Sequence, residues 1–478
     1  MKLHRISLYI YVLIILFILA PTYAQGQSPF TFSERFPKHE VRAVWITTIG
    51  GLDWPDNYAQ SAYSAIRQKR DFIRILNRLQ DANINTVLLQ TRVRGTTIYP
   101  SLIEPWDGCM SGFPGVSPGY DPLQFAIEEC HKRGIELHAW IVCMPLGEVK
   151  RTGYRHLKRV HPELCTTIKS HGFMRPEQPG TATYLASLCC EIVRNYDIDG
   201  IHLDYIRYPE EGRMAGYSDW KRNNITRIVK TVSENVKDIK PWVKMSCSPI
   251  GKYRSVSRYD SHGWDAYDIV YQDAQGWLRD GLMDALFPMM YFKGNNFYPF
   301  AADWKENSYG KIVAPGLAAY FMSRKEKNWP LSTITREMNV LRSFGMGHSF
   351  FRCRHFINDL KGIYNSTRYD IDLCPALIPP MTWMGRPAPS APKVFMKEYK
   401  GTQMLSWTQA TNNNDSPYLS YNIYRSKDYP VNTNDPRNLV AIRIKETEMS
   451  FFGQYHYAVT AVDRYGQESE ATQIKRTK

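Results

Sequence analysis

Short apolar segments alternate with amphipathic helical segments along most of this chain. Each apolar segment has the length of a buried strand, and the segments between them repeat apolar residues at helical spacing, as in 65–81, 219–239 and 332–345. Parallel strands need such crossover helices, so this alternation constrains the fold strongly. The strand-like segments are 41–48, 84–90, 135–142, 199–204, 242–247, 284–292, 311–318 and 346–352.

Eight strands separated by helices over residues 38–365 predict an α/β fold, a (β/α)8 TIM-type barrel with long inserted loops. An open, doubly wound sheet is the alternative. That fold would be expected to carry a glycine-rich phosphate loop after the first strand. Gly50 and Gly51 follow this strand without a G-x-G-x-x-G motif, so no dinucleotide site is indicated.

The composition changes near Pro375. Residues 375–392 are dense in proline, which predicts a semi-rigid linker. Residues 393–478 hold short alternating segments separated by turn residues, which is typical of a small all-β sandwich. The stretches "SYNIYRS" and "YHYAVTAVDRYGQES" resemble a fibronectin type III domain.

Residues 1–24 have the features of a secretory signal peptide. Lys2 and Arg5 precede an apolar run from Leu8 to Ala20, and small residues lie near Ala24. An uncleaved anchor is the alternative, but the run is short for a spanning helix. We therefore expect an exported protein, periplasmic, cell-surface or extracellular, without stable membrane insertion after signal cleavage.

The net charge of +14 favours anionic partners, such as an acidic glycan. The basic residues are scattered, and the chain has neither zinc-finger spacing nor a basic heptad region, which argues against a specific nucleic-acid partner. There is no C-x-x-C pair among the nine cysteines, so no metal site is indicated. We expect no organic cofactor.

Working residues of a (β/α)8 barrel lie at the carboxyl ends of its strands. This rule selects polar and aromatic residues that lie on, or follow, six of the predicted strands. They are Asp53, Trp54, Gln90, Arg92, Arg94, His138, Trp140, His202, Asp204, Asp273 and Tyr291. A G-x-S-x-G elbow is absent, so a serine hydrolase is not favoured.

A carboxylate pair is the minimum equipment that most glycoside hydrolases need. Asp204 is the best first member, because it ends a buried strand at the expected barrel mouth. Glu210, in the loop that follows, and Asp273 are the candidates for the second. The alternative is structural: Asp204 would pair with Arg207, and Glu210 would be solvated.

Neighbouring side chains would give the two carboxyl groups different pKa values. Arg92 or Arg207 would keep one carboxylate ionised, while an apolar wall of Trp140 or Tyr208 would raise the pKa of the other.

Five segments together are similar to one known family. They are "EVRAVWITTIGGLDWP", "INTVLLQTRVRGTTIYPS", "GYDPLQFAIEECHKRGIELHAW", "DGIHLDYIRYP" and "AYDIVYQDAQGWLRDGLMDALFPMMYF". In this order they resemble glycosyl-hydrolase-like family 10, bacterial glycosidases built on a (β/α)8 barrel. The resemblance implies hydrolysis of a glycan, with cell-wall or envelope glycans as the expected substrates.

The resemblance also assigns roles to individual residues. It places the family's acidic position after the fourth strand on Asp204 and the following glutamate on Glu210. Many relatives have a second aspartate directly after the first, where this chain has Tyr205. The other positions that the resemblance carries over are Gln90, Arg92, His138, Ala139, Trp140, Asp273 and Tyr291.

We therefore predict an exported glycoside hydrolase that cleaves a poly- or oligosaccharide with Asp204 and either Glu210 or Asp273. Two alternatives remain: a noncatalytic glycan-binding protein on the same barrel, and an interaction protein whose sandwich docks a partner. The predicted substrate-binding residues are Gln90, Arg92, His138, Trp140, His202, Arg207, Tyr208, Tyr291, Asp53 and Trp54.

Overall fold

The computed structural model describes residues 32–209, 218–257, 259–260, 262–399, 402–450 and 454–475. The chain forms two compact units, Met1–Arg35 and Phe36–Lys478, and the described element of the first is the short helix α2 (Phe32–Arg35). The predicted signal peptide, residues 1–24, lies outside the described residues. In the part that is described, no helix is both long and apolar enough to cross a membrane.

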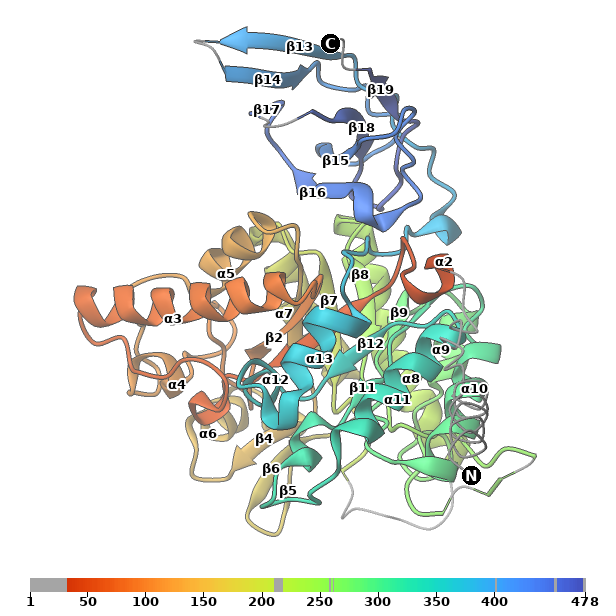
Figure 1. Cartoon of the computed structure of the whole chain (residues 1–478). Coiled ribbons are helices and arrows are strands. Elements are labelled where there is room, and N and C mark those ends of the chain that lie inside the picture. Colours follow the sequence, from red (N-terminus) through yellow and green to blue (C-terminus); the bar gives the residue numbers. More distant parts are fainter. Residues whose placement is uncertain are drawn as a thin grey trace, which may run out of the picture. The chain divides into compact units, whose positions relative to one another are not determined.

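One curled parallel sheet organises the larger unit (Figure 1). Within the described residues its strand order is β10-β9-β8-β7-β3-β2-β1-β12-β11, and neighbouring strands pair in parallel. All the strand segments predicted from the sequence contribute to it. The strands are β1 (Arg42–Ile46), β2 (Thr86–Arg92), β3 (Glu136–Val142), β7 (Gly200–Asp204), β8 (Lys244–Cys247), β9 (Ala285–Leu286), β10 (Ile312–Val313), β11 (Gly316–Leu317) and β12 (His348–Phe350).

The first and last strands of this order, β10 and β11, belong to one short stretch of chain. On one side, Gly316 N donates to Pro288 O at 2.8 Å, beside β9. On the other side, Ser349 N of β12 donates to Pro315 O at 3.0 Å. Proline has no N–H to donate, and Pro315 lies where the predicted strand 311–318 divides in two. The sheet is therefore strongly curled, and the stretch 312–317 bonds to a neighbour on each side.

Helices follow the strands as the sequence predicts, and local signals fix where they begin. Ser61 forms a capping box at the start of α3, and Asp121 caps α5, in which Pro122 is the first residue. The helices of the larger unit are α3 (Ala62–Asp81), α4 (Gly108–Ser111), α5 (Pro122–His131), α6 (Thr152–Val160), α7 (Pro179–Asn195), α8 (Ser218–Ile239), α9 (Ala274–Arg279), α10 (Tyr298–Glu306), α11 (Leu331–Ser343), α12 (Cys353–Ile357) and α13 (Ile363–Ser366).

A small antiparallel sheet follows β3 and was not anticipated in detail from the sequence. Its strands are β4 (Pro145–Glu148), β5 (Cys165–Ile168) and β6 (His171–Met174), in the order β4-β6-β5. The sequence predicted only long inserted loops here. This insertion matters for function, because it forms one wall of the cavity described below.

Alternation along the strands separates two apolar layers. One cluster of buried residues gathers Trp45, Leu88 and Trp140 from three strands and Phe287 from the residue after β9, inside the curl of the sheet. The intervening residues join the larger core between the sheet and the helices, which includes Val44, Leu89 and Ile141 among its members. All nine cysteines are buried and free, as expected for residues that act as small hydrophobes.

Two antiparallel sheets follow the parallel one, in orders β13-β14-β17 and β16-β15-β18-β19. They share a hydrophobic cluster to which Trp407 and Leu405 contribute from one sheet and Ile423 and Val459 from the other. The strands are β13 (Val394–Tyr399), β14 (Thr402–Trp407), β15 (Ser420–Ser426), β16 (Leu439–Ile444), β17 (Glu448–Ser450), β18 (His456–Val462) and β19 (Thr472–Ile474).

The proline-rich stretch begins packed against the parallel sheet. Leu377 N donates to Lys38 O at 2.8 Å, and Glu40 N donates to Leu377 O at 2.9 Å. Arg42 of β1 donates to the carbonyl of Cys374 at 2.6 Å. The start of the predicted linker is therefore held by main-chain bonds.

Two arginines of the C-terminal sheets reach acids at the amino ends of β3 and β7. Arg443 Nη1 lies 2.7 Å from Glu136 Oε1, and Arg464 Nη1 lies 2.9 Å from Asp199 Oδ1. Lys244 also donates to Glu136, at 2.9 Å. Burial alone would raise the pKa of Asp199, but His131 and Arg464 hold it well below its ordinary value. The C-terminal sheets therefore supply part of the neutralisation of these acids, beside Lys244 and His131.

Removing one arginine from this set of buried ion pairs should lower the stability of the protein. We expect Arg464→Ala to lower the free energy of unfolding by about 3–5 kcal/mol, because it leaves the buried Asp199 without its nearest arginine. Urea denaturation measures the loss. Arg437→Ala is the control, since Arg437 is exposed and pairs locally with Asp435. Equal effects of the two substitutions would contradict this account of the interface.

Candidate active site

A cavity of about 620 Å³ lies at the carboxyl ends of β1, β2, β3 and β7. This edge is where a parallel α/β sheet places its ligands. Six of the residues predicted from the sequence line the cavity. They are Gln90, Trp140, Asp204, Arg207, Tyr208 and Tyr291.

Asp204, the last residue of β7, is held by three neutral donors. Ser248 Oγ and the main-chain N–H of Tyr205 each donate to Oδ1, both at 2.8 Å. Trp140 Nε1 donates to Oδ2 at 3.0 Å. The side chain of Asp204 is thus fixed in orientation while the residue stays 5% exposed at the cavity wall.

Burial raises the pKa of the Asp204 carboxyl above its ordinary value. The hydrogen bond from Ser248, the charge of Arg207 and the bonds from Tyr205 and Trp140 oppose this rise, because each favours the ionised form. A carboxyl group with a raised pKa in an open cavity is suited to exchanging a proton with a bound molecule.

Aromatic and apolar side chains make up much of the remaining wall. Tyr291 packs with Phe351 at a ring-centroid separation of 5.6 Å, and burial raises the pKa of its hydroxyl well above the ordinary value. Gln90 accepts main-chain hydrogen bonds from Thr48 at 3.0 Å and Ile49 at 2.9 Å through Oε1, which fixes the loop after β1. A few polar groups on an apolar wall are typical of a small-molecule site.

Arg92 does not line this cavity, although the sequence suggested it. The pairing of β2 with β3 shifts register between Gln90 and Arg92, so these residues no longer face the same side. Arg92 is buried and binds Glu104 through two contacts, Nε to Oε2 at 2.8 Å and Nη2 to Oε1 at 2.7 Å. Arg92 is therefore one partner of a buried ion pair and not a residue of the cavity wall.

His138 and His202, which the sequence suggested for the site, lie below the cavity and do not line it. His138 Nδ1 is 3.3 Å and His202 Nδ1 is 3.1 Å from Ser246 Oγ, inside the curl of the sheet. Trp45 Nε1 donates to His202 Nε2 at 3.3 Å, and burial lowers the pKa of His202 well below its ordinary value. A neutral, enclosed imidazole packs the interior rather than contacting a ligand.

Asp53, Trp54 and Asp273 have structural partners and do not line the cavity. Asp53 binds Arg352 at 2.7 Å, and Trp54 is buried, with its indole N–H on the carbonyl of Gln68. Asp273 caps α9 by accepting from Gly276 N at 3.1 Å. Glu210, the preferred second carboxylate, lies outside the described residues.

Sequence reasoning missed the wall contributed by the insertion after β3. Lys169, His171 and Phe173 come from the β5–β6 hairpin and line the cavity. Arg94, which the sequence did indicate after the second strand, lines it as well. The β-branched run "CTTI" followed by "KS" and "HGFM" was the available signal for this hairpin.

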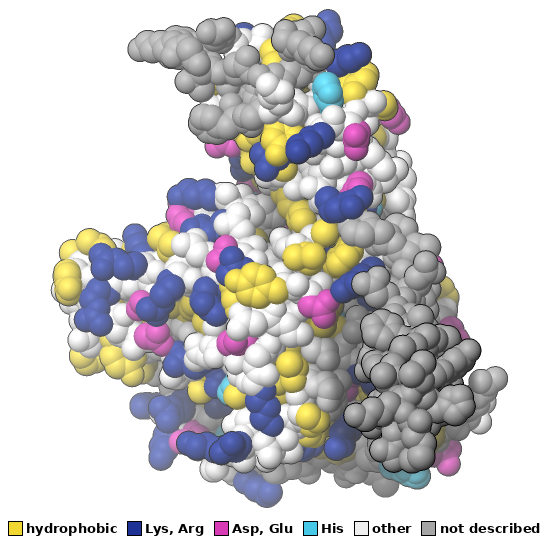
Figure 2. All heavy atoms as spheres, viewed as in Figure 1, with side chains coloured by type: hydrophobic (Ala, Val, Ile, Leu, Met, Phe, Trp, Pro, Cys, Tyr) yellow, Lys and Arg dark blue, Asp and Glu magenta, His cyan; other side chains and the backbone are white. Residues whose placement is uncertain are grey.

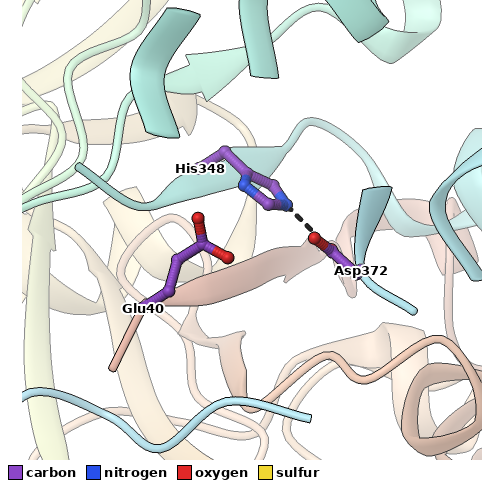
Figure 3. Close-up of side chains that lie close together, drawn as sticks. All are labelled: Glu40, His348 and Asp372. Atoms are coloured by element: carbon purple, nitrogen blue, oxygen red, sulfur yellow. Dashed lines mark hydrogen bonds and ion pairs between the residues drawn. The ribbon is translucent and has the colours of Figure 1, made fainter. Parts of the chain in front are cut away.

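A cluster of two acids and a histidine lies at the opposite, amino-terminal edge of the sheet. Ligand atoms of Glu40, His348 and Asp372 lie within 4.8 Å of one another, and Figure 3 shows His348 pointing at Asp372. Arg342 Nη2 lies 2.6 Å from both carboxylates, and Arg42 Nε is 2.7 Å from Glu40. The acids are already neutralised by guanidinium groups, so this cluster does not fit a cation.

A curled parallel sheet with a buried acid in a cavity at its carboxyl edge defines a barrel-like α/β protein. The chain matches the family described as "Glycosyl hydrolase-like 10" over residues 40–217 and 208–330. It therefore belongs to glycosyl hydrolase-like family 10, as the resemblance in the sequence implied.

Two curated relatives carry glycosyl hydrolase names. The chain is 28% identical to glycosyl hydrolase YngK of Bacillus subtilis strain 168, across 92% of this chain and 93% of that protein. It is 31% identical to glycosyl hydrolase DigH of Escherichia coli strain K12, across 61% of this chain and 76% of that protein.

Solved structures resemble the chain more distantly. The glycoside hydrolase domain of PgaB (BpsB) from Bordetella bronchiseptica aligns with 69% of this chain and 98% of that one, at 12% identity and a TM-score of 0.48. The catalytic domain of a Paenibacillus polymyxa β-amylase aligns with 71% of this chain and 99% of that one, at 10% identity and a TM-score of 0.45.

The Asp204 carboxyl should titrate above pH 3.8, its ordinary pKa. Burial favours its protonated form, so infrared difference spectra should show a protonated carboxyl band at higher pH that Asp204→Asn removes. Ser248→Ala should move the midpoint further up, because it removes a donor that favours the ionised form. Ser246→Ala, two residues earlier in the chain, should not move it, because Ser246 contacts His138 and His202 instead of Asp204. A midpoint at or below 3.8 would refute this account of Asp204.

Proposed function

We propose that the protein is a glycoside hydrolase in which Asp204 is a catalytic carboxyl group. The observation that carries this proposal is the placement of Asp204: three donors orient it, burial raises its pKa, and it lines a cavity at the carboxyl edge of the sheet. Membership of glycosyl hydrolase-like family 10 supports the same reaction class.

Hydrolysis of a glycosidic bond needs a proton for the leaving oxygen and a carboxylate at the oxocarbenium-like centre. Asp204 would supply one of these groups. We keep Glu210 as its partner, since it directly follows Pro209, which lines the cavity. Asp273 is the weaker candidate, because its carboxylate caps α9 and binds the hydroxyl of Tyr253 at 2.6 Å.

The substrate we propose is a poly- or oligosaccharide. A cavity of about 620 Å³ has room for a sugar unit with its neighbours, and its aromatic wall suits the apolar faces of sugar rings. Among the charged residues of the described part of the chain that line this wall, the basic Arg94, Lys169 and Arg207 outnumber Asp204, which favours an anionic glycan.

The finer features of the architecture belong to the same proposal. We infer a closed (β/α)8 barrel, which the bonds of stretch 312–317 to β9 and β12 support. We also propose a fibronectin type III-like sandwich for residues 393–478, and export directed by residues 1–24.

A noncatalytic glycan-binding protein remains the second candidate. One observation favours it: among the described residues that line the cavity, Asp204 is the sole carboxylate. A binder needs no second acid, whereas a two-carboxylate hydrolase does. Turnover therefore decides between the two candidates.

A reducing-end release screen across bacterial and plant polysaccharides tests the proposal. Asp204→Asn should lower turnover on the active polysaccharide by about 100-fold or more while glycan binding persists, because the substitution removes the proton-exchanging group and little bulk. Asp121→Asn is the matched control and should retain turnover, since Asp121 caps α5 outside the cavity and asparagine also caps helices. Absence of release by the wild-type protein from every polysaccharide would leave the binding protein as the better account.

A further inference from the structure

A second cavity, of about 450 Å³, adjoins the one that holds Asp204. The two cavities share part of their lining: Ile49, Val93, Arg94 and Gly147 contribute to both. The two cavities are therefore neighbours that meet at these residues, beside the loops after β1 and β2. A chain of sugars bound at Asp204 would continue into this second cavity.

Arg94 stands at the junction of the two cavities and is exposed. Its aliphatic stem packs over Gly147, where an added Cβ would meet Arg94 Cδ at 3.3 Å. The guanidinium makes no hydrogen bond and no ion pair with the described part of the chain. This contrasts with Arg92, two residues earlier, whose guanidinium is bound to Glu104.

The acids in the second cavity do not neutralise Arg94. Asp107 caps α4 by accepting from Cys109 N at 2.8 Å, and it also accepts from Thr96 Oγ1 at 2.6 Å. Glu148 lies 3.7 Å from Lys150 and 4.0 Å from Arg151, on the outer rim. An unpaired guanidinium in a cleft is therefore available to an anion that arrives with a ligand.

An aromatic surface lies in the same cavity. Tyr58 lines it and is 57% exposed, which is high for a tyrosine whose ring also packs against Gly112. A tyrosine ring offers an apolar face and a polar edge, which suits a sugar ring. The second cavity thus combines a flat apolar surface with an unpaired cation.

We propose that the second cavity is a subsite for a carboxylate-bearing sugar unit, with the carboxylate bound by Arg94 and the sugar ring against Tyr58. This inference rests on the proposed glycan site at Asp204 and deepens it: the substrate is an anionic glycan long enough to occupy both cavities. Arg94 is then a specificity residue rather than a catalytic one.

Binding measured without turnover tests this subsite. In an Asp204→Asn background, titration calorimetry compares carboxylated glycans (polygalacturonate, alginate, hyaluronan and bacterial cell-wall glycan) with their carbodiimide-amidated, uncharged derivatives. We expect at least one carboxylated glycan to bind better than its amidated form. Adding Arg94→Gln should reduce that preference by about tenfold, the scale of one lost charge-assisted contact.

Matched variants separate the carboxylate contact from general charge effects. Arg159→Gln removes the same charge from an exposed position outside both cavities and should keep the preference. Arg94→Lys should restore part of the preference for the carboxylated glycan. Tyr58→Ala should weaken the binding of both the carboxylated and the amidated form. No preference for any carboxylated glycan, or equal losses from Arg94→Gln and Arg159→Gln, would overturn the subsite. Because the readout is binding, the subsite can stand even where Asp204 proves noncatalytic.

Discussion

The parallel register of β3 against β7 is the constraint on which the candidate site depends. Val142 pairs with Asp204 and Trp140 pairs with His202, so Trp140 lies beside the end of β7 on the interior face. That placement lets Trp140 Nε1 donate to the Asp204 carboxyl at 3.0 Å. A shift of this register by one residue would turn Asp204 away from the interior and dismantle the site.

Asp204, at the carboxyl edge of the parallel sheet, has different partners from the acids at the amino edge. Acids at the amino edge are paired with arginines, which are Arg42 and Arg342 for Glu40 and Asp372, and Arg443 and Arg464 for Glu136 and Asp199. At the carboxyl edge, Asp204 receives its hydrogen bonds from neutral donors, and Arg94 lies open in the cleft. Lys and Arg side chains are also distributed over the visible face in Figure 2 rather than gathered in one patch. The carboxyl edge also has buried ion pairs, Arg92 with Glu104 and Asp53 with Arg352, so it is Asp204 and Arg94 that differ from the charged groups around them.

The sequence predicted the order of strands and helices well, because apolar periodicity is a local property. It also selected Asp204, since a buried run that ends in an acid is visible without coordinates. It could not place Arg92, because the register shift after Gln90 depends on the pairing between β2 and β3. Asp273 looked free in the sequence, but it is the capping residue of α9. The wall formed by Lys169 and Phe173 depends on how an insertion folds back, which periodicity does not reveal.

The docking of the C-terminal sheets bears on how their role can be tested. A chain ended near Cys374 would lose Arg443 and Arg464 together, leave Glu136 and Asp199 without these partners and uncover the amino edge of the sheet. Lost activity in that truncated chain would then reflect a destabilised sheet, and would not show that the C-terminal sheets bind a partner. Substitutions on the exposed surface of these sheets are free of that difficulty, because they keep both arginines in place. The interaction-protein alternative is therefore decided by surface substitutions and not by truncation.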